Sequence, residues 1–149
     1  MRQAFIQRAR SDDTARLLMS APGVGVVVAL AYMTGVEDPA RFKRSSSVAA
    51  YFGMTPRRYQ SGEVDHAGRI SKCGDGMVRS LLFEAAKVLL SRSARPSALK
   101  TWGDALGKRI GAKKATMAVA RKLAVILHRM WIDGTEFCWS VAGAATQAA

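Results

Sequence analysis

The chain has 149 residues, of which 49% are hydrophobic and 23% are charged, enough for one globular domain and too few for two large ones. Its 23 Lys and Arg against 11 Asp and Glu give a formal net charge of +12. This composition argues against a disordered chain and favours a polyanionic partner, because neutralising phosphates releases their condensed counterions. Ribosomal association, an anionic membrane surface and a merely solubilising surface are the alternatives.

Helices are predicted at the start of the chain, where they flank a glycine-rich turn. Residues 1–14 read as the end of a linking helix, with a natural N-cap in the Ser-Asp-Asp-Thr that begins at Ser11. The next helix is expected to end near Ser20. The segment Pro22–Gly25 then forms a tight turn, and a second, apolar helix runs to about Met33.

Short helices and polar segments alternate in the middle of the chain. The letters EDPARF (37–42) predict a polar break, and SSSVAAYFG predicts a short helix that a serine caps and Gly53 closes. Residues 55–75 are polar, rich in Arg, Gly and Ser, and without hydrophobic periodicity, so a long loop is expected there. Asp75 is placed to cap the helix that follows.

Three helical patterns make up the rest of the chain. Apolar residues recur at helical spacing over 76–92, while Arg79 points away from that apolar face. Residues 94–111 predict a shorter helix, which its two internal glycines weaken. The letters AKKATMAVARKLAVILHRMW (112–131) predict the last clear helix.

The predicted fold is therefore mainly α. A helix-hairpin-helix-like part (15–35) is followed by the polar loop (55–75) and a helical part (76–139), with a frayed tail over 140–149. No internal repeat occurs, and no alternating strand pattern is longer than a few residues.

The turn at Pro22–Gly25 has the form of a helix-hairpin-helix motif. In that motif Gly23 and Gly25 would let the backbone approach a DNA phosphate, and the second helix would present its N-terminal N–H groups to it. A tight turn before a buried apolar helix would produce the same letters. Local sequence leaves both interpretations open.

The polar loop combines a serine with a high density of cations. Arg57, Arg58, Arg69 and Lys72 lie within about a dozen positions of Ser61. Arginines clamp non-bridging phosphate oxygens and stabilise charge that develops at phosphorus, so the cluster suits a phosphodiester. Ser61 is the candidate nucleophile, although a serine in an ordinary flexible turn is the alternative.

Neither a metal site nor a disulfide framework is predicted. Cys73 and Cys138 are far apart and lack a CxxC partner, and His66 and His128 have no carboxylates at ligand spacing. The apolar run 24–33 is too short to span a bilayer, and no signal peptide opens the chain, so we expect a cytoplasmic protein.

Several separated motifs occur in the order of one known family. They are LLMSAPGVG, DPARFK, AAYFGMTPR, SGE…GRISKCGD…VRSLLFEAA and the closing AVARKLAVILHRMW. From about Ala15 to Trp139 the chain resembles the C-terminal half of insertion-sequence transposases of the IS110 type, the bridge-RNA-guided DNA recombinases.

The resemblance implies DNA recombination in transposition. The family's serine nucleophile falls on Ser61, whose Oγ would attack the scissile phosphodiester and form a transient phosphoserine link. The segment matching GRISK would make Arg69 and Lys72 phosphate-handling residues. The partners implied are DNA, a guide (bridge) RNA and further copies of the chain.

The chain also departs from the family. The family's N-terminal RuvC-like domain, with its metal-binding acidic residues, has no counterpart here. We therefore expect a separated C-terminal domain that holds no cofactor itself and needs that domain, with Mg²⁺, for strand transfer. Whether the chain alone is an enzyme stays open. The rivals are a non-catalytic helix-hairpin-helix DNA-binding module and an inactive transposase remnant.

Overall fold

The computed structural model describes residue 3, residues 12–55 and residues 76–139, and each regular element in these ranges is a helix. The prediction of a mainly α fold is therefore confirmed. The elements are α2 (Asp13–Leu18), α3 (Val26–Val36), the short 3₁₀ helix η1 (Pro39–Arg41), α4 (Ser46–Tyr51), α5 (Gly76–Arg92), α6 (Ala98–Ile110) and α7 (Ala112–Asp133). None of the helices described is both long and apolar enough to cross a membrane.

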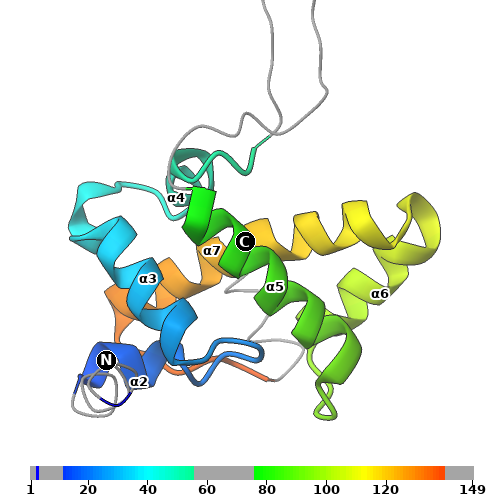
Figure 1. The fold of residues 1–149 in the computed structure, drawn as a ribbon, viewed down its shortest axis with the longest axis horizontal. Helices are drawn as coiled ribbons and strands as arrows, with labels where there is room; N and C mark the ends of the chain where they lie inside the picture. The colour runs from blue at the N-terminus through cyan, green and yellow to red at the C-terminus, as the bar shows by residue number, and fades with distance from the viewer. Residues whose placement is uncertain (1–2, 4–11, 56–75, 140–149) are drawn as a thin grey trace, which may run out of the picture.

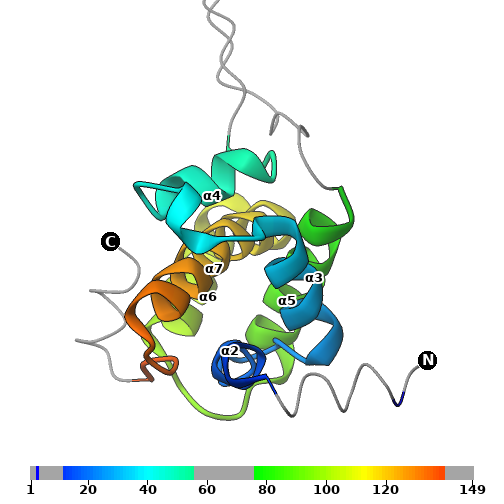
Figure 2. The same ribbon diagram turned by 90° about the vertical axis from the view of Figure 1, so that its left-hand side faces the viewer.

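The longest helix, α7, lies at the centre of the fold. It packs against α2, α4, α5, α6 and η1. Figure 1 shows it crossing the molecule behind α5, with α2 and α3 near one end and α6 near the other, and Figure 2 looks along it from that first end. Its buried residues include Val119, Leu123 and Leu127, which recur every fourth residue as one apolar face.

Side-chain caps explain where three of the helices begin. Asp12 accepts a hydrogen bond from the backbone N–H of Ala15, as the N-cap predicted around Ser11 requires. Ser97 caps α6 in the same way, through the N–H of Lys100. The break predicted over 37–42 is the 3₁₀ helix η1, which Asp38 caps.

The serine at the start of α4 does not act as predicted. Ser45 occupies the N-cap position, but its side chain makes no capping hydrogen bond. Its Oγ lies 2.8 Å from Nδ1 of His128 in α7 instead. The hydroxyl thus joins two elements rather than capping its own helix.

The glycines of α6 are packing positions rather than weak points. The helix runs unbroken from Ala98 to Ile110. A Cβ added to Gly103 would lie 2.7 Å from a side-chain carbon of Leu90 and equally close to one of Val119. The missing side chain therefore lets α6 approach α5 and α7, which offsets the poor helix propensity of glycine.

Hydrogen bonds tie distant segments to this core. The hydroxyl of Ser20, after α2, donates to the carbonyl oxygen of Leu17 and accepts from the backbone N–H of Phe137. Phe137 is 4% exposed, so this contact anchors the segment after α7 to the end of α2. Residues 1–2, 4–11 and 140–149, which include most of the predicted linking helix and the tail, lie outside the described residues.

Candidate functional site

The predicted nucleophile and cations lie outside the described part of the chain. Ser61, Arg57, Arg58, Arg69 and Lys72 all fall within residues 56–75. The predicted cap Asp75 falls there as well. The structure does describe the two ends of the loop, Thr55 after α4 and Gly76 at the start of α5.

We call the residues that hold these two ends the loop base. Phe52, Met54 and Val78 are each at most 1% exposed. Gly35 of α3 is the contact point, because a Cβ there would lie 3.0 Å from the ring of Phe52 and 3.2 Å from Val78. Three helices therefore meet where the loop leaves the core, and the missing side chain of Gly35 permits it.

A hydrogen bond closes the loop base. Nη1 of Arg79, in the first turn of α5, donates to the carbonyl oxygen of Phe52 at 3.1 Å. This bond joins the residues on the two sides of the loop directly. Arg79 was predicted to point away from the apolar face of its helix, yet it is half-buried and reaches α4. The isolated helical pattern could not show this, because the acceptor belongs to another helix.

The glycine turn at 22–25 has two different faces. Gly23 has a φ of +79°, and a Cβ there would collide with the carbonyl oxygen of Ala85 in α5 and lie 3.0 Å from its carbonyl carbon. This glycine therefore allows close packing between the turn and α5. The observation explains Gly23 without a ligand, and its assignment to DNA contact stays a prediction.

Gly25, in contrast, faces open space. It is the N-cap of α3 and is exposed, and a Cβ added to it would meet nothing within 4 Å. Its φ of −97° is accessible to any residue. Of the two predicted glycines, only Gly25 is placed where a nucleic-acid backbone could approach. Its role in binding also stays a prediction.

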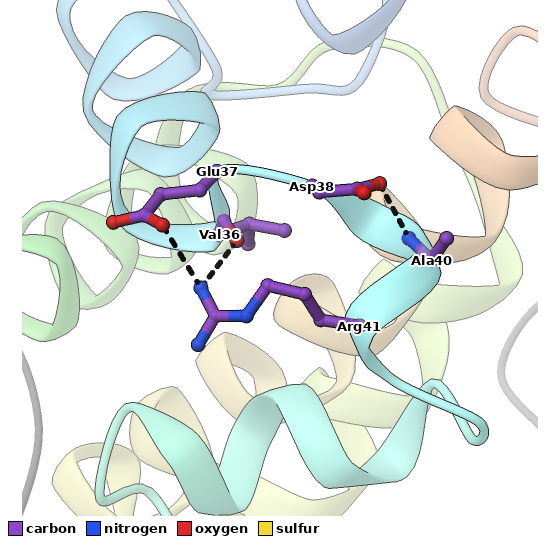
Figure 3. A network of polar contacts seen from close by, with 5 residues as sticks. All are labelled: Val36, Glu37, Asp38, Ala40 and Arg41. Atoms are coloured by element: carbon purple, nitrogen blue, oxygen red, sulfur yellow. Dashed lines mark hydrogen bonds and ion pairs between the residues drawn. The ribbon is translucent and has the colours of Figure 1, made fainter.

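A polar network closes the end of α3 (Figure 3). Arg41 donates from Nη1 to the carbonyl oxygen of Val36 at 2.9 Å and lies 3.5 Å from Oε2 of Glu37. Glu37 has a φ of +66°, a strained value for a residue other than glycine. The guanidinium also lies over the rings of Phe42 and Tyr51, at 5.3 and 5.2 Å from their centroids. Arg41 therefore stabilises a turn, and its charge is partly neutralised.

A pocket of about 530 Å³ opens beside η1 and the start of α4. Its lining carries cations, hydroxyls and one acid around an apolar floor: Phe42, Lys43, Arg44, Ser45, Ser46, Val125, His128, Arg129, Ile132 and Asp133. Lys43 and Arg44 are exposed and make no ion pair with the residues that the structure describes. Arg129 lies 4.0 Å from Asp133. The rim is therefore net positive.

His128 at the floor of this pocket is a structural residue. It is 2% exposed, and its Nε2 lies 2.8 Å from the carbonyl oxygen of Pro39. Because a carbonyl only accepts, Nε2 carries the hydrogen, and Nδ1 forms a hydrogen bond with the hydroxyl of Ser45. Both ring nitrogens are thus occupied by protein groups.

The described residues offer no metal-binding cluster: over 12–55 and 76–139, no three His, Cys, Asp or Glu side chains are grouped so that they could hold an ion.

Comparison with known proteins identifies the family. Residues 15–102 match the sequence model described as "Transposase IS116/IS110/IS902 family". The matched segment includes the glycine turn, the whole polar loop and the loop base. The chain belongs to the IS116/IS110/IS902 transposase family.

Individual relatives are identical to the chain at about a third of the aligned positions. The transposase for insertion sequence element IS1111A of Coxiella burnetii is 35% identical over 120 residues, which cover 80% of this chain and 33% of that protein. The transposase for IS1328 of Yersinia enterocolitica is 32% identical over 127 residues, 85% of this chain and 38% of that protein. The pilin gene-inverting protein of Moraxella bovis is 30% identical over 118 residues, 78% of this chain and 36% of that protein. The chain therefore spans about a third of the length of these relatives.

Proposed function

We propose that this chain is the DNA-binding part of a transposase that recombines DNA through a serine nucleophile, Ser61. The observation that carries the proposal is the family match over residues 15–102, because it spans the serine and all four loop cations. The net charge of +12 supports a phosphate-bearing partner. The relatives named as transposases and as a gene-inverting protein support strand exchange as the reaction.

The proposed step is a transesterification. The Oγ of Ser61 attacks the scissile phosphorus, an Oγ–P bond forms, and the bond from phosphorus to the leaving sugar oxygen breaks. The serine proton passes to a base, and the leaving strand takes up a proton as a free hydroxyl. A second strand's hydroxyl then attacks the phosphoserine and restores Ser61, so no external energy source is needed.

The loop cations have a defined part in this step. Negative charge builds up on the non-bridging oxygens as Oγ approaches phosphorus, and arginine donors in a fixed geometry stabilise it. We assign this role to Arg57, Arg58, Arg69 and Lys72. The buried loop base supports the proposal, because a nucleophile works best when rigid elements position its surroundings.

The described residues do not fit the Mg²⁺ that the family resemblance implies, since they hold no group of three metal-ligating side chains. We therefore derive no step through a metal. We propose that a RuvC-like acidic domain would supply it, and that a guide RNA and further copies of the chain complete the assembly. In this proposal the chain by itself binds DNA without strand transfer.

A non-catalytic helix-hairpin-helix module is the second candidate. The openness of the space around Gly25 at the start of α3 favours it, since a phosphate could approach the backbone there. In that case Ser61 has no role in any DNA complex.

Covalent trapping tests the proposal. The chain is mixed with nicked target-like DNA, Mg²⁺ and a separately expressed acidic domain from a relative, and denaturing gels are searched for a protein–DNA band. Ser61→Ala is compared with Ser71→Ala, a matched change of another serine in the same loop.

A band that Ser61→Ala abolishes and Ser71→Ala preserves would support the serine nucleophile. Salt-sensitive DNA retention with no covalent band would favour the binding module. The absence of both a covalent band and DNA retention would contradict both functions and indicate an inactive remnant.

A further inference from the structure

The turn that joins α6 to α7 gathers exposed positive charge. Lys108 and Arg109 end α6, Lys113 and Lys114 begin α7, and all four are exposed. We call residues 108–114 the basic tip. The sequence contains no acidic residue between Asp104 and Asp133.

The charge of the basic tip is not neutralised within the part of the protein that the structure describes. The ion pairs found there involve Arg41, Lys87 and Arg129, and none includes a residue of the tip. A Cβ added to Gly111, at the apex, would meet nothing within 4 Å. The tip is therefore open to a large ligand from outside.

The tip is held on a packed helical pair. Gly111 alone separates the two helices, with a φ of +96° that favours glycine. Behind it, Leu106, Ala115 and Ala118 form a small buried cluster against which Trp102 packs. Nζ of Lys122 lies 4.4 Å from the centroid of the Trp102 ring, which adds a contact between the helices. The four cations are thus displayed on a preformed support.

We propose that the basic tip, whose residues lie outside the polar loop in the sequence, binds the phosphate backbone of duplex DNA; this rests on the proposed DNA-binding function. A helix with its side chains is about 10–12 Å across, so two side by side measure roughly 20 Å. The major groove is only about 12 Å wide, so the helical pair does not enter it. The tip therefore contacts phosphates across the groove rather than base edges, and its binding is independent of sequence.

The tip lies far from the pocket beside α4 and from α3. In Figure 1 the junction of α6 and α7 is at the opposite end of the molecule from α3 and α4. His128, which contacts the start of α4, follows Ala112 by sixteen residues on the same helix, a rise of roughly 24 Å at about 1.5 Å per residue. One duplex that touched both regions would extend over about seven base pairs, at about 3.4 Å per pair.

The test measures DNA retention by the full chain as a function of salt. Duplexes of several unrelated sequences are titrated between about 50 and 200 mM salt, where each lost phosphate contact reduces the magnitude of the negative slope of log K against log[salt] by about 0.9. The triple variant Arg109→Gln, Lys113→Gln and Lys114→Gln is compared with Arg16→Gln, Lys87→Gln and Arg92→Gln, which removes the same charge from exposed positions elsewhere. Thermal unfolding confirms that both variants fold.

We expect the tip variant to reduce the magnitude of the slope by about two to three and the affinity by at least about tenfold, equally for all sequences, with a smaller effect of the control. Equal effects of the two variants would overturn the proposal that the tip contacts DNA, while leaving the proposed DNA binding of the chain intact. Tip-dependent retention of an RNA duplex or of anionic vesicles, without retention of DNA, would overturn the DNA assignment. Failure of the unmodified chain to retain DNA would contradict the proposed function itself.

Discussion

The hydroxyl group of Tyr32 donates a hydrogen bond to the carbonyl oxygen of Ala124, with 2.6 Å between the two oxygens. The bond joins α3 to the central helix α7 across 92 positions of sequence, and both residues are fully buried. A polar atom in such a place is stabilising only while its partner is present, because an unpaired buried donor costs free energy.

Removing this hydroxyl should weaken the fold slightly and leave DNA binding unchanged. In Tyr32→Phe the carbonyl of Ala124 keeps the position of an intrahelical acceptor, so we expect the free energy of unfolding to fall by only about 1 kcal/mol. Tyr32→Ala also leaves a cavity and should cost about 3–5 kcal/mol. Chemical denaturation measures both. A Tyr32→Phe variant as unstable as Tyr32→Ala would show that the hydrogen bond, rather than the ring, holds α3 in place.

Stability at high pH should depend on the same phenol. Burial raises the pKa of Tyr32 well above its usual value of 10.0. The contribution of this phenol to the free energy of unfolding is complete below pH 10, because it is then protonated in both the folded and the unfolded chain. Above that pH the unfolded chain releases the proton while the folded protein keeps it, so the free energy of unfolding falls by about 1.4 kcal/mol per pH unit from this group.

Denaturation curves between about pH 9 and 11 check this dependence. Tyr32→Phe should lose stability less steeply than the unmodified protein as the pH rises. Equal slopes in the unmodified protein and in Tyr32→Phe would contradict the prediction.

The two glycines of the hairpin should respond differently to substitution. Gly23→Ala places a methyl group against the carbonyl of Ala85 at a φ that side chains rarely adopt, so we expect a loss of at least about 2 kcal/mol. Gly25→Ala enters open space but replaces the N-cap of α3 with a poorer capping residue, so it should cost no more than about 1 kcal/mol. Thermal unfolding separates the two.

Only Gly25 can therefore report on DNA contact at this turn. A bulky residue there, such as Gly25→Leu, should leave the fold intact and lower DNA affinity if a phosphate approaches the backbone. Unchanged affinity in a folded Gly25→Leu protein would show that the glycine turn at 22–25 is not part of the DNA-binding surface. Gly23 variants do not decide the question, since their loss of binding would follow from loss of packing.

A second pair of glycines, in α6, offers a test of packing alone. Gly103→Ala would bring its Cβ to 2.7 Å from Leu90 and Val119, so we expect it to destabilise the protein by about 1–3 kcal/mol. Gly107→Ala would lie 3.7 Å from Ala115, an ordinary contact, and should stabilise by up to about 1 kcal/mol through helix propensity. If both substitutions stabilise, α6 packs less tightly than the distances indicate.

The helices could largely be predicted from sequence because local signals specify them. The N-cap Asp12 and the apolar spacing of α5 and α7 are readable within a few residues. The contacts that hold the candidate site could not be read in this way. Gly35, Arg79 and His128 each act on a residue from another helix, and a local pattern carries no information about such partners.

The chemistry proposed for the polar loop, in contrast, rests on the sequence alone. Ser61 and its cations were proposed from composition and family resemblance, and the structure describes only the residues at both ends of their loop. The basic tip is an intermediate case. Its lysines are plain in the sequence, but their gathering at one turn follows from the single residue that joins α6 to α7.

The segment that matches the family model is shorter than the segment that folds, because the central helix α7 lies outside the match. The family match ends at Trp102, inside α6, whereas α7 begins ten residues later and supplies the surface on which α2, α4 and α5 pack. A fragment cut at the end of the match would leave apolar faces such as that of Leu82 and Leu89 without their cover. Substitutions in α7 can therefore inactivate the protein by unfolding it, even at positions that do not contact DNA. Transfer of the polar loop to another protein would require α7 as well, because the helices that hold the loop pack on it.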